Sequence, residues 1–129
     1  KNVQAHHPGK YCTIITSVES KDSEYVITGG NDQTIKIWKL QDYDLEREHT
    51  INLENEDVST VIYLEDHKVL ASTHHKSKVK FWTFPEGKLI SEVDTGLTCL
   101  RNLFAIPDKN MVATADLKKD QVQLIKLVK

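Results

Sequence analysis

The stretch "ITGGNDQTIKIWKL", residues 27–40, has the most informative pattern in this sequence. Two glycines and an Asn-Asp pair separate a short apolar run from a second run that ends near Trp38. β-Branched and aromatic residues favour strands, whereas Gly, Asn and Asp favour tight turns. The stretch therefore predicts two strands that are joined by a turn at Asn31 and Asp32.

Both strands recur twice along the chain. The second strand, "TIKIWKL" (34–40), matches "KVKFWTF" (78–84) and "QVQLIKL" (121–127), and the first strand, "YVITGG" (25–30), matches "KVLAST" (68–73) and "NMVATA" (110–115). A strand-like run also precedes each pair, at residues 12–18, 58–64 and 97–106. A fourth strand-like run lies between successive repeats, at residues 47–54 and 88–94. The period is 44 residues from Ile35 to Val79 and 43 residues from Val79 to Val122. Three such repeats, with four short strands each, have the layout of propeller blades.

The repeats predict an all-β fold of three β-propeller blades in an open arc, each blade a four-stranded antiparallel sheet. We expect residues 1–46 to form blade 1, residues 47–87 blade 2 and residues 88–129 blade 3, all within one propeller domain. Residues 1–6 are a candidate for the outer strand of a preceding blade or for ring closure.

Apolar residues occupy both faces of the last strand in each repeat. Ile35 and Ile37 point to one side of the predicted sheet, while Trp38 and Leu40 point to the other. A sheet with this pattern is sandwiched between neighbours. Because a closed propeller usually needs about four to eight blades, we expect these blades to contact further blades of the same chain or another copy.

The first repeat resembles the WD-repeat β-propeller family, and the resemblance extends as three consecutive blades over nearly the whole chain. Six residues fall at the spacing of that family: Gly29, Asp32, Thr34, Ile35, Ile37 and Trp38. The resemblance implies a structural hydrogen-bond network of His7, Thr28, Asp32 and Trp38, with His6 as the alternative histidine. Each buried polar group of such a network costs about 1–3 kcal/mol if it lacks a partner.

The other two repeats depart from the family pattern. Lys76 stands at the aspartate position of the second repeat, and no histidine precedes Val58. Ile125 stands at the tryptophan position of the third repeat. We therefore expect neither blade to build the complete network.

Composition restricts the classes of partner and the compartment. The chain has 17 basic and 19 acidic residues, and this balance argues against a dedicated nucleic-acid binder. Its apolar runs are too short for a transmembrane helix, so we expect no membrane contact. Cys12 and Cys99 indicate buried thiols in an intracellular protein, cytoplasmic or nuclear. Because the sequence begins at Lys1 without an initiator Met, we expect a fragment of a larger propeller.

The sequence predicts no enzyme, metal site or cofactor. The adjacent pairs His6-His7 and His74-His75 cannot easily chelate one ion, because neighbouring residues of a strand point to opposite faces. Nothing places a nucleophile on a strained elbow, and "TGGND" lacks the lysine and helix of a phosphate-binding loop.

The resemblance implies that protein partners bind the loops on one end of the propeller. The residues that we expect on this surface are Asn31, Glu56, Asp57, His75, Lys76 and Lys118. The expected function is a non-catalytic protein–protein interaction scaffold within a multiprotein assembly. The alternatives are a nucleic-acid-associated propeller subunit in RNA processing, or an accessory domain of an enzyme that lies outside this segment.

Overall fold

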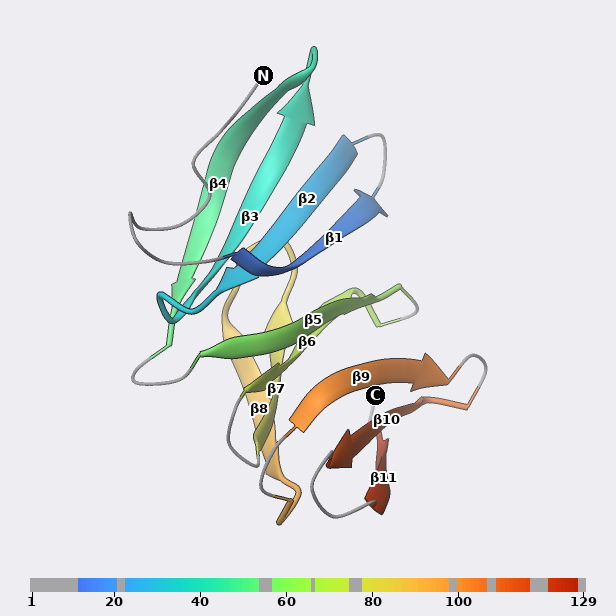
Figure 1. The fold of residues 1–129 in the computed structure, drawn as a ribbon. Coiled ribbons are helices and arrows are strands. Elements are labelled where there is room, and N and C mark those ends of the chain that lie inside the picture. Colours follow the sequence, from blue (N-terminus) through green and yellow to red (C-terminus); the bar gives the residue numbers. More distant parts are fainter. Residues whose placement is uncertain are drawn as a thin grey trace.

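The computed structural model describes residues 12–20, 23–53, 57–65, 67–74, 78–97, 100–106, 109–116 and 121–127. These residues form three antiparallel sheets, which stack along the chain (Figure 1). The described part contains strands and turns, with no helix long and apolar enough to span a lipid bilayer. The all-β prediction is therefore confirmed.

The first sheet, blade 1, is a meander of four strands in sequence order. It contains β1 (Cys12–Ser20), β2 (Ser23–Gly30), β3 (Thr34–Gln41) and β4 (Asp44–Asn52). Consecutive antiparallel strands pair because only a few residues separate them.

The second sheet, blade 2, has the same topology. It contains β5 (Val58–Leu64), β6 (Val69–His74), β7 (Lys78–Thr83) and β8 (Leu89–Asp94). In both blades the register shifts once where the third strand meets the fourth, just before Trp38 and just before Trp82. The same irregularity at equivalent positions supports the assignment of a structural repeat.

The third sheet, blade 3, has three strands among the described residues. These are β9 (Leu100–Ile106), β10 (Met111–Asp116) and β11 (Gln121–Lys126), and β10 lies between the other two. Blade 3 therefore lacks the fourth strand that was predicted for it within the described part of the chain.

The sheets divide the chain at different points from the predicted blade boundaries. The strand near residues 47–54 was assigned to blade 2, but β4 pairs with β3 and belongs to blade 1. Likewise β8 pairs with β7 and belongs to blade 2 rather than blade 3. The reason is the short connection at Asp42 and Tyr43, which turns the chain straight back on itself. Residues 1–6, the candidate closing strand, lie outside the described residues.

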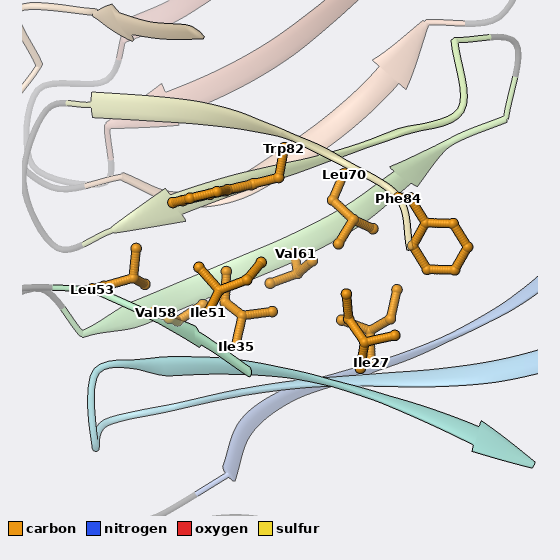
Figure 2. Close-up of a cluster of buried hydrophobic side chains, with 10 residues drawn as sticks. Ile27, Ile35, Ile51, Leu53, Val58, Val61, Leu70, Trp82 and Phe84 are labelled. Carbon is orange, nitrogen blue, oxygen red and sulfur yellow. The ribbon is translucent and has the colours of Figure 1, made fainter. Parts of the chain in front are cut away.

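The core consists of two apolar layers, one at each junction between blades. The layer between blades 1 and 2 contains Ile27, Ile35, Ile37, Ile51, Leu53, Val58, Val61, Leu70, Trp82 and Phe84 (Figure 2). The layer between blades 2 and 3 contains Leu64, Ala71, Val79, Phe81, Leu97, Leu100, Leu103, Val112 and Ile125. Blade 2 thus buries one face against each neighbour, as the two-sided apolar pattern indicates.

Phe84 shows how closely the first two blades fit. Its ring lies 5.0 Å from the ring of Tyr25 in β2, nearly perpendicular to it, and 5.0 Å from the ring of Tyr63 in β5. Edge-to-face aromatic pairs add about 0.5–1.5 kcal/mol to the burial of their surface. Strands β1, β5 and β9 also lie side by side, so the blades meet along their first strands (Figure 1).

Candidate partner-binding surface and the network beneath it

A buried hydrogen bond joins β2 to β3 in blade 1. Val26 is directly opposite Trp38 in the register, so Thr28 lies diagonally across from the indole on the same face. The indole Nε1–H of Trp38 donates to Thr28 Oγ1 at 3.0 Å. Both side chains are buried, at 5% and 4% exposure. The bond satisfies a donor that would otherwise be costly to bury.

Asp32 fixes the turn that connects the same two strands. Its Oδ1 accepts from the backbone N–H of Thr34 at 3.2 Å and from the Thr34 hydroxyl at 2.7 Å. This arrangement is an Asx turn, in which a carboxylate replaces a backbone acceptor. Thr28 and Trp38 are therefore hydrogen-bonded to each other, while Asp32 is hydrogen-bonded to Thr34. His7, the remaining predicted member of the network, lies outside the described residues.

A backbone bond ties this turn to the segment that enters blade 2. The N–H of Leu53 donates to the carbonyl oxygen of Gln33 at 2.8 Å. Leu53 itself is buried in the layer between blades 1 and 2. The turn at residues 31–33 is thus stabilised by the hydrogen bonds between Asp32 and Thr34 and by the backbone bond from Leu53 in the next connecting segment.

Blade 2 contains a hydrogen-bonded chain that the sequence analysis missed. Trp82 Nε1–H donates to Ser72 Oγ at 2.9 Å, and Ser72 Oγ lies 3.0 Å from Nε2 of His74. His74 is fully buried, at 0% exposure. Because the Ser72 oxygen accepts from the indole, its own hydrogen can be donated to His74 when Nε2 is unprotonated.

His74 adds a histidine to blade 2 that the sequence analysis did not consider for this network, because it does not precede Val58. The expected histidine was sought on the loop before the blade, but this one comes from the end of β6. Ser72 and His74 are two residues apart on a strand, so they point to the same face. That spacing was visible in the sequence and could have identified the pair. Lys76, at the aspartate position, lies outside the described residues.

Blade 3 differs from the other blades at the positions of the tryptophan and of its hydroxyl partner. Ile125 replaces tryptophan and is buried, so no indole donor is present at that position. The hydroxyl of Thr114, which corresponds to Thr28 and Ser72, donates to the backbone carbonyl of Asn102 at 2.8 Å. At these positions blade 3 thus has the Thr114–Asn102 hydrogen bond within the sheet and the apolar side chain of Ile125 in place of an indole.

The structure describes two of the six predicted surface residues. Asn31 lies in the turn above Asp32, and Asp57 lies just before β5. Both are half-buried, and the bond between Leu53 and Gln33 brings their two segments together. Glu56, His75, Lys76 and Lys118 lie outside the described residues. Across the described ranges, no group of three or more His, Cys, Asp or Glu side chains could hold a metal ion.

Comparisons with known proteins agree with this architecture. The family model described as "WD domain, G-beta repeat" matches residues 2–39. The crystal structure of the Cps50 (Swd1) β-propeller domain of Myceliophteria thermophila is similar, with a TM-score of 0.71 and 11% sequence identity. That alignment covers 81% of this chain and 37% of the Swd1 chain.

The computationally designed protein Ika4 is also similar, with a TM-score of 0.68 and 17% identity over 88% of this chain and 66% of the Ika4 chain. At these identities the likeness shows the fold alone. The chain spans just over a third of the Swd1 chain, 37% of its length. Residues 2–39 therefore match a WD repeat, and the blade topology and the propeller neighbour show that the chain has the fold of β-propeller blades.

Proposed function

We propose that this chain is a non-catalytic scaffold that binds protein partners within a multiprotein assembly. The WD40 propeller fold is generally a protein-interaction scaffold. The observation that supports this role here is the turn at residues 31–33, which is held by Asp32 and by the Leu53–Gln33 bond. A rigid turn loses little conformational entropy when a partner binds, so more of the contact energy contributes to affinity.

The proposed contact surface is the end of the arc that carries this turn. Asn31 and Asp57 lie there, and we propose that Glu56, His75, Lys76 and Lys118 complete it. The scaffold would act inside the cell, in the cytoplasm or the nucleus, which is consistent with only two cysteines in 129 residues. No cofactor or metal is part of this proposal.

Site-specific photo-crosslinking would test which end of the blades binds partners. A photo-reactive phenylalanine would replace Asn31 or Asp57 in the protein as its own cells make it. Tyr43 is the matched control, because it is 98% exposed and lies at the other end of β3 (Figure 1). We expect the first two positions to form discrete adducts with the same protein, and Tyr43 to form few.

Two results would overturn the proposal. One is a set of protein adducts that forms at Tyr43 and not at residues 31 and 57. The other is a set of adducts that contain RNA or DNA, with binding that weakens steeply as salt rises. That second result would favour the nucleic-acid-associated alternative, because phosphate contacts release counterions.

A further inference from the structure

A fully buried histidine lies beside the apolar layer that joins blades 1 and 2. His74, at the end of β6, is 0% exposed, and its Nε2 lies 3.0 Å from Ser72 Oγ. Ser72 accepts from the indole of Trp82, which belongs to this apolar layer. A histidine side chain in water takes up a proton near pH 6.5. A group that titrates in the physiological range is therefore enclosed by protein.

The other two blades have no histidine at the equivalent position. Two residues after the aligned hydroxyl residue, blade 1 has Gly30 and blade 3 has Asp116, and both are buried. Glycine has no group to titrate, and Asp116 loses a charge in acid whereas His74 gains one. A blade can therefore form without an imidazole at this position. Among the described residues, the buried histidine is a feature of blade 2.

Protonation of His74 would place a positive charge on a side chain with no exposure to solvent. An imidazolium carries a hydrogen on both ring nitrogens, so Nε2 could no longer accept the hydrogen of the Ser72 hydroxyl. The Ser72 oxygen would then face two donors, the indole and the imidazolium. Burial of a charge is costly unless an opposite charge pairs with it. The packed junction therefore favours the neutral form of His74.

Charged groups of both signs surround His74 in the described part of the chain. Residues that are directly opposite in a register share a face, and Lys80 is opposite Ser72, so it lies on the face of His74. The titratable groups on this face of blade 2, on the facing side of blade 1 and on the segment before β5 are Lys78, Lys80, Glu92, Asp94, His49 and Asp57. Lys39 and Glu46 face the junction from the other end of blade 1.

The carboxylates of blade 2 on this face already have partners. Glu92 binds Lys78 at 3.2 Å, and Asp94 accepts from the N–H of Gly96 at 3.0 Å. Asp57 precedes Val58, the register partner of His74, and would favour protonation. Because Asp57 is half-buried and in partial contact with solvent, it offsets the cost of a buried charge only in part.

We propose that His74 is a pH-sensitive device in the fold, which keeps blades 1 and 2 packed while it is neutral and loosens their junction when it takes up a proton. The opened chain binds this proton freely and the packed chain does not. Opening therefore becomes more favourable as pH falls below about 6.5. One proton changes the opening equilibrium by at most about tenfold per pH unit. The inference rests on the fold, so the photo-crosslinking result does not bear on it.

Hydrogen exchange of the intact protein and of its His74→Gln variant, at pH 7.5 and at pH 5.5, tests the proposal. Glutamine stays neutral at both values and keeps an amide near Ser72. We expect the backbone amides of β3 and β5 to lose protection in acid in the unsubstituted protein, by up to about tenfold, relative to the variant at the same pH. Comparison at one pH cancels the other titrating groups, Asp116 included. His49→Gln is the matched control, because His49 faces the same junction but is half-buried, and it should behave like the unsubstituted protein.

Nuclear magnetic resonance of the unsubstituted protein with ¹⁵N-labelled histidine rings gives a second measurement if the His74→Gln variant fails to fold. We expect the ring of His74 to stay neutral at pH 6, where free histidine side chains are mostly protonated. The inference is wrong if His74 takes up its proton at pH 6 while β3 stays protected. It is also wrong if the unsubstituted protein and the His74→Gln variant lose protection equally in acid. A loss in β10 as large as the loss in β3 would contradict the assignment to the junction of blades 1 and 2.

Discussion

Ser72 holds two buried partners with one hydroxyl group. Its oxygen accepts from the Trp82 indole at 2.9 Å and lies 3.0 Å from His74 Nε2. Neither partner has access to water at this position, since Trp82 is 6% and His74 0% exposed. The stability of blade 2 therefore depends on the hydroxyl group of Ser72, although this small side chain contributes little apolar surface of its own.

Ser72→Ala should lower the free energy of unfolding by about 2–4 kcal/mol, because the indole and the imidazole each lose a buried hydrogen-bond partner. Thr114→Val is the matched control in blade 3, where the hydroxyl contacts a backbone carbonyl and no second side chain depends on it. This substitution should cost only about 1 kcal/mol. Urea unfolding followed by tryptophan fluorescence would measure both, and equal losses would contradict the role assigned to Ser72.

The hairpin of β3 and β4 illustrates how an element can contain a locally unfavourable residue. Asp42 and Tyr43, its two connecting residues, have φ values of 50° and 67°. Both central residues of a type I′ hairpin turn need positive φ, which favours Gly and Asn. Tyr43 is 98% exposed and gains no burial in compensation. The hairpin therefore forms through its strand pairing and despite its turn sequence.

Tyr43→Gly should raise the free energy of unfolding by roughly 0.5–1.5 kcal/mol, because glycine adopts positive φ without the Cβ clash. Tyr43→Ala is the control, since alanine keeps the Cβ and should bring no gain. Thermal melting by circular dichroism would compare the two variants. A similar rise for both would show that loss of the aromatic ring, and not backbone strain, is responsible.

The whole molecule depends on close contact between blades, and Gly87 provides a direct probe of it. Gly87 has a φ of 75°, and a Cβ built there would lie 2.8 Å from Cγ1 of Ile51. Ile51 belongs to β4 in blade 1, whereas Gly87 belongs to the connection between β7 and β8 in blade 2. Gly96 has nearly the same φ, 73°, but a Cβ there would meet nothing within 4 Å.

Gly96→Ala should cost about 1 kcal/mol from backbone strain alone. Gly87→Ala should cost about 2–4 kcal/mol, because overpacking at the junction of the blades adds to the same strain. Combining Gly87→Ala with Ile51→Ala removes the clashing atom, so the double variant should be more stable than the sum of the two losses predicts. Denaturant unfolding of all four variants would measure this coupling. Additive losses would show that Gly87 does not report on the contact between blades.

Much of the architecture was predictable because β-structure repeats every two residues. The alternation of Ile35 and Ile37 with Trp38 predicted a sheet with two apolar faces, and the register and burial agree with it. His74 escaped prediction because the histidine was sought on the loop before the blade, whereas His74 lies at the end of β6. The pairing of β4 with β3 was also misassigned, since repeat boundaries in sequence do not state which neighbouring strand a segment joins.

The sequence by itself determined which residues share a face, because side-chain direction follows from local backbone geometry. Only the tertiary structure decided which of those faces are covered, because burial depends on what lies next to a sheet in space. Ile35 and Val122 occupy the same place in the repeat, yet Ile35 is 0% exposed and Val122 is 74% exposed. Blade 2 packs against the first residue, and no described blade packs against the second.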